Sequence, residues 1–232
     1  NSRVGGKSVR AFAAIFQKSP FCLLSKKAKG IETPADLAGK QIGVHSAESS
    51  IMTEVVLASQ GLTFKDIVPV QTGWEPRLLI NDEVDVFAGF MDHGPSYLRE
   101  KGYEPAFIPA FEHGYDFYSG VCFASDRMIR RRPERIRNFL TATLRGWQEA
   151  FRSPEDTAKI IVEKYYPKGS IQSQRESLKI FQELAIMGAE DVTIGMMDKQ
   201  VWQKGINILQ KFGRIEKKIP SKKLFTLKLL KK

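Results

Sequence analysis

The sequence contains few cysteines and histidines and no long apolar run. Among 232 residues there are two cysteines, Cys22 and Cys122, and three histidines. Two cysteines do not make a disulfide framework, and no cysteines or histidines have the short spacing of a zinc site. We therefore predict free, buried thiols and no bound metal. No apolar run reaches the ~18 residues that span a bilayer, so no transmembrane helix is expected.

The short motifs of several enzyme classes are also missing. No GxSxG, HExxH, GxxxxGK[ST] or GxGxxG pattern occurs in the chain. This absence favours a non-enzymatic protein, although catalytic groups can also be assembled in space from distant residues. We expect no catalytic residues and no cofactor.

Positive charge is concentrated in two segments. The chain has 36 Lys and Arg against 26 Asp and Glu, a formal net charge of +10. Residues 211–232 contribute +8 and residues 126–137 contribute +4, which leaves −2 for the rest. Proteins that bind nucleic acid spread basic residues along one face, so we predict no nucleic-acid partner. The terminal lysines form either a solvated tail or a tail near an anionic membrane surface.

Short apolar segments alternate with helical patterns over most of the chain. Thr33, Pro34 and Asp36 have the residue types of a helix start. The alternation predicts an α/β fold with a parallel, doubly wound sheet. We expect strands at 9–15, 21–25, 41–45, 67–71, 84–88, 104–109 and 118–124. We expect longer helices at 49–60, 133–151, 154–165, 172–187 and 197–212, and a short strand or helix at 225–230.

Polar and aromatic residues directly follow three of these strands. Ligands of open α/β sheets bind beyond the carboxyl ends of the strands, so we predict one ligand crevice there. Residues next to the strands at 9–15 and 118–124 are expected to border it. The predicted ligand-binding residues are Phe16, Ser19, Ser46, Glu48, Ser50, Trp74, Phe90, Asp92, His93, Tyr115 and Tyr118.

Several of these residues also have a purely structural interpretation. Ser46 or Ser49 can cap the helix that follows them, and Asp92 can cap the next one. Trp74 can cover the edge of the sheet instead of stacking on a ligand. Residue types alone do not decide between these interpretations.

Seven segments, in this order, resemble the type 2 periplasmic solute-binding proteins. They are AAIFQKSP (13–20), GIETPADLAGKQIGV (30–44), VDVFAGF, DHGPSYL, YDFYSGVCFASDRMI, LRGWQEAF and IGMMDKQVW. The resemblance is to the group named after thiamine-pyrimidine biosynthesis and transport proteins, and it runs from Val9 onward. One departure is Asp92-His93-Gly94-Pro95, where these proteins often have Asn-Glu-Pro, so the usual ligand is not implied.

The resemblance implies two α/β lobes that are joined by hinge strands and close on a solute. Residues 1–32 would be the hinge-side part of lobe 1, 33–117 lobe 2, and 118–232 the return strand and C-terminal helices that complete lobe 1. A β-α-β portion that the family places before the first strand is not matched. We therefore expect an incomplete first lobe with an exposed apolar edge beside Ala11 to Ile15. We also expect Cys22 and Cys122 on neighbouring strands.

The function implied by the resemblance is solute binding outside the cytoplasm. The expected protein is a monomer that binds a small, heteroaromatic solute for the permease of an ABC-type transporter. It would be periplasmic or extracytoplasmic, with or without a membrane anchor. One alternative is the ligand-sensing domain of a membrane histidine kinase or cyclase, whose partner is a signalling module. A second alternative is a thiamine-pyrimidine synthase-like enzyme.

Overall fold

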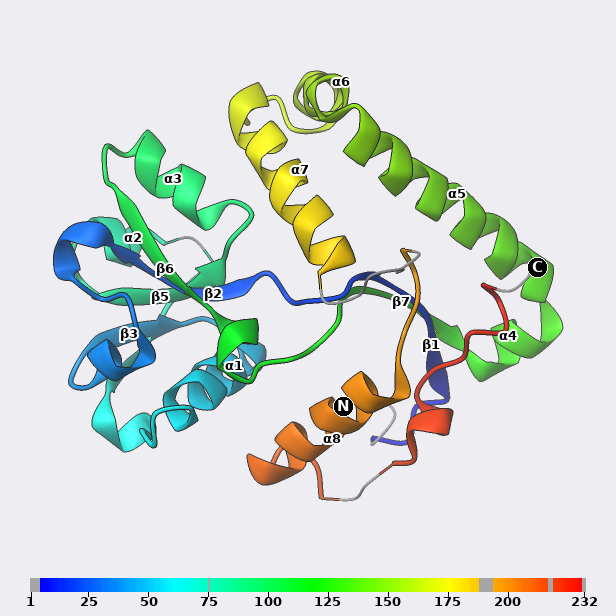
Figure 1. Ribbon diagram of the computed structural model, residues 1–232, viewed down its shortest axis with the longest axis horizontal. Coiled ribbons are helices and arrows are strands. Elements are labelled where there is room, and N and C mark those ends of the chain that lie inside the picture. Colours follow the sequence, from blue (N-terminus) through cyan, green and yellow to red (C-terminus); the bar gives the residue numbers. More distant parts are fainter. Residues whose placement is uncertain (1–4, 75, 188–193, 217–218, 231–232) are drawn as a thin grey trace. The chain divides into compact units, whose positions relative to one another are not determined.

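The computed structural model describes residues 5–74, 76–187, 194–216 and 219–230 (Figure 1). Its contacts divide the chain into two compact units. Unit 1 comprises Asn1–Ser19, Asp116–Ile171 and Phe181–Lys232, and unit 2 comprises Pro20–Tyr115 and Gln172–Ile180. The assignment of lobes 1 and 2 to 1–32, 33–117 and 118–232 stays a prediction. No helix of the described ranges is long and apolar enough to cross a membrane.

Unit 2 is built on a five-stranded mixed sheet in the order β4-β3-β5-β2-β6. β3 runs parallel to β4 and β5, whereas β2 runs antiparallel to β5 and β6. The expectation of a wholly parallel sheet is therefore wrong, because the apolar pattern of a strand does not encode its direction. The strands are β2 (Phe21–Lys26), β3 (Gln41–Val44), β4 (Val68–Gln71), β5 (Val86–Phe90) and β6 (Pro105–Pro109).

Two 3₁₀ turns of unit 2 begin with a capping box, in which side chains bind the free backbone N–H groups. The Asp36 carboxylate accepts hydrogen bonds from the Thr33 N–H and hydroxyl, both at 2.8 Å, as the sequence of this turn suggested. The carboxylate of Asp66 accepts the equivalent bonds from Thr63. The α-helices are α1 (Ala47–Ala58), α2 (Arg77–Ile80) and α3 (Gly94–Glu100), and the 3₁₀ turns lie at Lys27–Lys29, Pro34–Leu37, Phe64–Asp66 and Ala110–His113.

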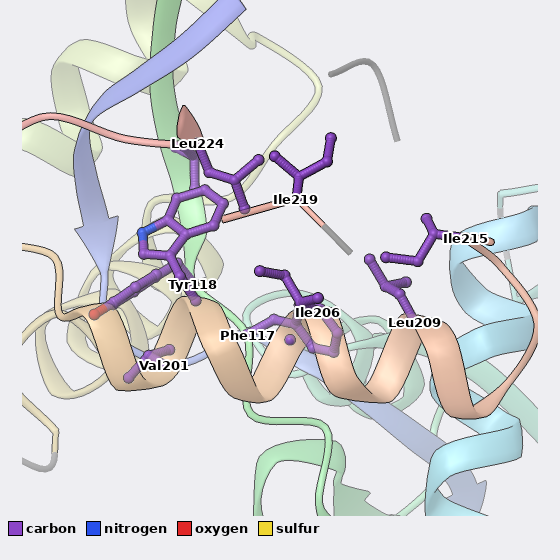
Figure 2. Close-up of a pocket in the computed structure, with 11 residues that line it drawn as sticks. Phe117, Tyr118, Val201, Ile206, Leu209, Ile215, Ile219 and Leu224 are labelled. Carbon is purple, nitrogen blue, oxygen red and sulfur yellow. The ribbon is translucent and has the colours of Figure 1, made fainter. Parts of the chain in front are cut away.

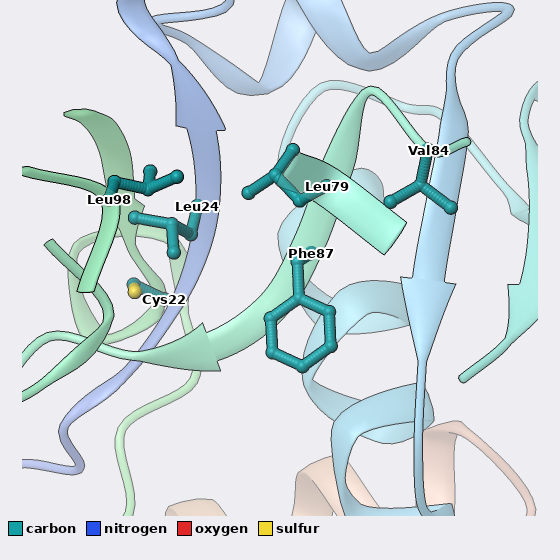
Figure 3. Packing of buried hydrophobic residues seen from close by; sticks show 6 residues of the cluster. All are labelled: Cys22, Leu24, Leu79, Val84, Phe87 and Leu98. Carbon is teal, nitrogen blue, oxygen red and sulfur yellow. The ribbon is translucent and has the colours of Figure 1, made fainter. Parts of the chain in front are cut away.

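The sheet of unit 2 carries an apolar core (Figure 3). Its members are at most 3% exposed and come from β2, β5, α3 and the α2 region. A Cβ on Gly94 would lie 3.0 Å from Leu24 Cδ2, so glycine lets the start of α3 approach β2 closely. The core residues are Cys22, Leu24, Leu79, Val84, Phe87 and Leu98.

Unit 1 combines a two-stranded antiparallel sheet with most of the long helices. β1 pairs with β7 over almost its whole length. The helix expected at 154–165 ends earlier, at Ile160, and continues as a π-helix over Ile161–Tyr165. The elements are β1 (Val9–Phe16), β7 (Ser119–Ser125), α4 (Asp126–Arg131), α5 (Pro133–Arg152), α6 (Pro154–Ile160) and α8 (Lys199–Lys211). The helix α7 (Ile171–Ile186) is divided between the units, with Gln172–Ile180 in unit 2 and residues 171 and 181–186 in unit 1.

The expected exposed edge beside Ala11 to Ile15 is wrong. Residues 11–16 are each at most 6% exposed. The Ala11 N–H donates to the Leu224 carbonyl and the Thr226 N–H donates to the Ala11 carbonyl, both at 2.9 Å, and Ala14 exchanges two hydrogen bonds with Gly195. The C-terminal segment thus covers this edge, and it does so with a single bridge at Phe225 rather than with a strand or helix.

The two cysteines are free, as expected, but they do not lie on neighbouring strands. Cys22 lies on β2 between Gly89 and Pro109, in the sheet of unit 2. Cys122 lies on β7 opposite Ala13, in the sheet of unit 1. Cys22 is fully buried and Cys122 is half-buried, and burial raises the pKa of both thiols.

We predict that the two thiols differ in reactivity toward a disulfide reagent such as DTNB. In the native protein Cys122 reacts and Cys22 does not, because thiolate formation and reagent access are both suppressed for a fully buried thiol. Unreduced protein in denaturant releases two equivalents of chromophore. The Cys122→Ser variant should show no native reaction and one equivalent on unfolding. Finding no reactive thiol in denaturant would contradict the assignment.

Candidate functional site: the strand-end cluster of unit 2

Aromatic side chains meet at one edge of the sheet in unit 2. β4, β3 and β5 are adjacent and parallel, so their carboxyl ends lie at the same edge. The ring of His45, which follows β3, lies 4.1 Å from the ring of Trp74 and 5.7 Å from that of Phe87, centroid to centroid. Phe90, at the end of β5, stacks on His93 at 5.6 Å. We call His45, Trp74, Phe87, Phe90 and His93 the strand-end cluster.

Two more rings extend this cluster. Because β2 is antiparallel to β5, its first residue, Phe21, pairs with Phe90, and the two rings stack at 4.4 Å. Tyr115 packs edge-on against Phe21 at 5.9 Å. Burial raises the pKa of the Tyr115 phenol, and the negative charge of Glu48 raises it further, so this hydroxyl stays protonated at neutral pH.

A glycine on β3 creates the space in which the cluster packs. A Cβ on Gly43 would lie 2.8 Å from Thr72 Cγ2 and 3.4 Å from a ring carbon of Phe87. The Phe87 ring lies next to both Gly43 and the ring of His45, which is 5.7 Å away between centroids. Thr72, Phe87 and His45 therefore occupy one face of the sheet at its carboxyl edge.

The serines after β3 are engaged in the start of α1. The Ser46 hydroxyl accepts a hydrogen bond from the Ser49 N–H at 3.1 Å. The Ser49 hydroxyl accepts from the N–H groups of His45 and Ser46 at 3.0 and 2.9 Å. The Ser50 hydroxyl donates to the Ser46 carbonyl at 3.0 Å. The capping interpretation of Ser46 and Ser49 is thus confirmed.

Asp92 and His93 form a pair instead of a helix cap. Asp92 Oδ2 lies 3.0 Å from His93 Nδ1, and α3 begins at Gly94 without a side-chain cap, so the capping interpretation of Asp92 is wrong. The hydrogen bond and the charge of Asp92 raise the pKa of His93. The Asp92 carbonyl accepts a hydrogen bond from the hydroxyl of Ser177 on α7, which fixes this turn.

His45 and Thr72 have buried side-chain nitrogen and oxygen atoms for which the described part of the chain provides no hydrogen-bond partner of normal geometry. Both ring nitrogens of His45 and the Thr72 hydroxyl are buried and make no hydrogen bond of normal geometry within the described residues. Burial lowers the pKa of His45 and outweighs the smaller opposing effect of the Ala88 backbone, so the imidazole is neutral at neutral pH. The cluster therefore combines a neutral imidazole with an acid-paired one.

The structure distributes the predicted ligand residues over both units. Unit 2 contains Ser46, Glu48, Ser50, Trp74, Phe90, Asp92, His93 and Tyr115, and unit 1 contains Phe16, Ser19 and Tyr118. Trp74 is 65% exposed, so it is not a core residue. Phe16 is buried and packs against Trp147 at 5.1 Å and Phe181 at 4.8 Å, and Ser19 is also buried. That the residues of both units form one ligand site stays a prediction.

Sequence reasoning missed four residues of this region, namely Phe21, His45, Thr72 and Phe87. His45 is the last residue of the strand predicted at 41–45, and Thr72 directly follows the strand predicted at 67–71; positions at strand ends are the signal that selected their neighbours. Phe21 could be placed at this edge only once the direction of β2 was known. Among the described residues, no three His, Cys, Asp or Glu side chains are grouped closely enough to hold a metal ion.

Unit 1 contains an apolar pocket of ≈ 280 Å³ beside α8 (Figure 2). The Tyr118 hydroxyl at its wall accepts a hydrogen bond from the Asp198 N–H at 2.6 Å, at the start of α8, so it is already engaged. The pocket offers apolar surface with few polar groups to orient a solute, unlike the strand-end cluster. Its lining residues are Phe117, Tyr118, Val121, Val201, Trp202, Gly205, Ile206, Leu209, Ile215, Ile219 and Leu224.

Solved structures with a similar fold include periplasmic binding proteins and a desulfurization enzyme. The Escherichia coli periplasmic aliphatic sulphonate-binding protein SsuA matches with a TM-score of 0.76 at 14% identity, over 96% of this chain and 70% of that chain. The desulfurization enzyme DSZB matches with a TM-score of 0.69 at 12% identity, over 96% of this chain and 78% of that one. The chain thus has a mixed α/β fold of the periplasmic-binding-protein class.

The sequence itself identifies the family. The family model described as NMT1/THI5 like matches residues 1–157, and the chain belongs to this family. A curated relative, the riboflavin-binding protein RibY of Chloroflexus aurantiacus, is 22% identical over 97% of this chain. The chain spans 66% of that relative's length. The resemblance seen in the ordered sequence segments is confirmed.

We predict that truncating Trp74 leaves the fold intact. Trp74 is 65% exposed, so Trp74→Ala should change the free energy of unfolding by less than about 1 kcal/mol. The matched variant Phe16→Ala removes a buried ring and should cost about 3–5 kcal/mol. Urea denaturation of both variants measures the difference. A loss of several kcal/mol in Trp74→Ala would show that this ring is a structural core residue.

We predict that His45 and His93 titrate on opposite sides of their ordinary value of 6.5. Because the pKa of His45 is lowered in the folded protein, the unfolded chain binds this proton more readily. His45 therefore lowers the free energy of unfolding as the pH falls below 6.5 and has no such effect above it. The raised pKa of His93 stabilises the fold below 6.5, and this contribution is lost as the pH rises through the folded value. NMR titration, assigned with His45→Gln and His93→Gln, measures both. Asp92→Asn should lower the pKa of His93 alone; an unchanged value would contradict the pairing.

Proposed function

We propose that this chain is an extracytoplasmic solute-binding protein that binds a flat, uncharged heteroaromatic solute at the strand-end cluster. The observation that carries the proposal is Trp74. Its ring is 65% exposed and packs on His45 at the carboxyl edge of the sheet. An exposed indole supported by a packed aromatic layer offers a stacking face with little loss of conformational freedom.

The charges near the cluster support an uncharged ligand. The predicted ligand residues of unit 2 include two acids, Glu48 and Asp92, and no Lys or Arg. A sulphonate would meet these carboxylates, a neutral His45, and a His93 imidazole that is already paired with Asp92. Of the two binding activities named among the relatives, riboflavin binding fits this environment and sulphonate binding does not. The fold likeness alone does not distinguish these ligands.

The arrangement of reactive groups supports binding over catalysis. The His93 imidazole hydrogen-bonds to Asp92 through Nδ1, and the hydroxyl of Ser177 donates to the carbonyls of Asp92 and Ser173. Cys22 is fully buried and its raised thiol pKa opposes thiolate formation. We therefore propose that the solute leaves unchanged and passes to the permease of an ABC-type transporter. The monomeric state and the location outside the cytoplasm belong to this proposal.

Isothermal titration with two contrasting probes tests the proposal. Riboflavin represents a flat heteroaromatic solute, and hexanesulphonate represents an aliphatic sulphonate. We expect riboflavin to bind and hexanesulphonate not to bind. Trp74→Ala should weaken riboflavin binding by at least about tenfold, equivalent to about 1.4 kcal/mol. Mass spectrometry should recover the bound riboflavin unaltered after prolonged incubation.

The control variant is Trp202→Ala, which alters the apolar pocket of unit 1. Its riboflavin affinity should equal that of the wild type. If neither riboflavin nor the smaller rings adenine and uracil bind, or if only Trp202→Ala weakens binding, the proposed site is wrong. Conversion of riboflavin to another product would contradict the non-enzymatic part of the proposal.

A further inference from the structure

We propose that His45 and Thr72 select the ligand by hydrogen-bonding the edge of its ring, and that the ligand displaces the Trp74 side chain to reach them. This inference rests on the proposed function, because it concerns the same strand-end cluster. It assigns a role to two residues that neither residue type nor family likeness singles out. Three features of the cluster support it: buried polar atoms without a hydrogen-bond partner among the described residues, their common location at the sheet edge, and an exposed Trp74 side chain that can rotate.

The first feature is a concentration of unsatisfied polar atoms. Among the described residues, six buried side-chain nitrogen and oxygen atoms lack a hydrogen-bond partner, and three of them belong to His45 and Thr72. A buried polar group without a partner costs free energy, which a ligand recovers when it supplies the partner.

The second feature is the common location of these atoms. The side chains of Thr72 and Phe87 both pack over Gly43, and the His45 ring lies 5.7 Å from the ring of Phe87. A side chain at position 43 would collide with Thr72 Cγ2 at 2.8 Å. The imidazole and the hydroxyl therefore occur on the same side of the sheet edge, where one planar ligand can contact both.

The third feature is the exposed Trp74 side chain. The Trp74 ring lies 4.1 Å from the His45 ring at a tilt of 41° and is 65% exposed, so one side contacts the imidazole and much of the rest faces solvent. A Cβ on the preceding Gly73 would meet no atom within 4 Å, so the space beside this turn is open. Rotation of the Trp74 side chain uncovers His45 without a change in the sheet. The displaced indole can then stack on the ligand.

The donor and acceptor pattern defines the class of ligand. A neutral imidazole has one N–H donor and one nitrogen acceptor, and a threonine hydroxyl both donates and accepts. This pair complements a ring edge that presents an N–H next to a carbonyl, as in a cyclic amide or imide. Such a ring is also planar and stacks on indole. An alkyl chain would satisfy none of these atoms, and an anion, which only accepts, would leave the acceptor nitrogen of the imidazole without a partner.

The test compares riboflavin, which has a cyclic imide, with 3-methylriboflavin, in which the imide N–H is replaced by N–CH₃. We expect wild-type protein to bind riboflavin at least tenfold more tightly than 3-methylriboflavin in isothermal titration. His45→Phe retains the ring packing and Thr72→Val retains the shape. Each should weaken riboflavin binding at least tenfold and bring the ratio of the two affinities close to one.

Matched controls are His113→Phe and Thr143→Val, which make the same changes outside the strand-end cluster and should leave both affinities unchanged. Circular dichroism and urea midpoints establish that each variant is folded. If His45→Phe is unstable, His45→Gln replaces it; this variant retains hydrogen-bonding groups and should recover part of the preference for riboflavin over 3-methylriboflavin. The inference is overturned if the wild type binds riboflavin and the folded variants His45→Phe, His45→Gln and Thr72→Val keep the same ratio of affinities for riboflavin and 3-methylriboflavin. The proposed function would not be affected by that result. Binding of neither flavin by the wild type overturns the inference, and failure of adenine and uracil as well overturns the proposed function.

Discussion

The packing of Thr72 and Phe87 over Gly43 is the constraint on which the strand-end cluster depends. The missing side chain on β3 lets both residues approach to contact distance. Phe87 then supports His45, and His45 supports the exposed ring of Trp74. The apolar core beneath, which includes Phe87 and Leu24, holds these strands in place. A site that binds by stacking needs this kind of rigid support, because a mobile ring would lose entropy on binding.

Local sequence patterns predicted most elements of the fold. The strands that alternate with helices in unit 2, and the long helices of unit 1, occur close to their expected positions. The turn at Thr33 and Asp36 formed as its residue types indicated. These features depend on neighbouring residues, so a single sequence contains the information for them. The family was recognisable for the same reason, from the order of short segments.

Features that depend on distant residues could not be predicted. The direction of β2 follows from its insertion between β5 and β6, and it places Phe21 at the edge of the cluster. The edge of β1 is covered by Leu224 and Thr226, more than 200 residues later in the chain. Ser46 and Trp74 were selected from their positions after strands. His45 and Thr72 lie at the same strand ends, but their buried polar atoms without a hydrogen-bond partner in the described ranges are visible only in the structure.

The central claim is that the strand-end cluster of unit 2 is where a flat solute binds. The chain has three tryptophans, Trp74, Trp147 and Trp202, so an NMR spectrum contains three indole N–H signals. Single Trp→Phe variants assign them. We predict that titration with riboflavin shifts the Trp74 signal and leaves that of Trp202 in place. A shift of the Trp202 signal with an unchanged Trp74 signal would contradict the account, because the solute would then occupy the apolar pocket of unit 1.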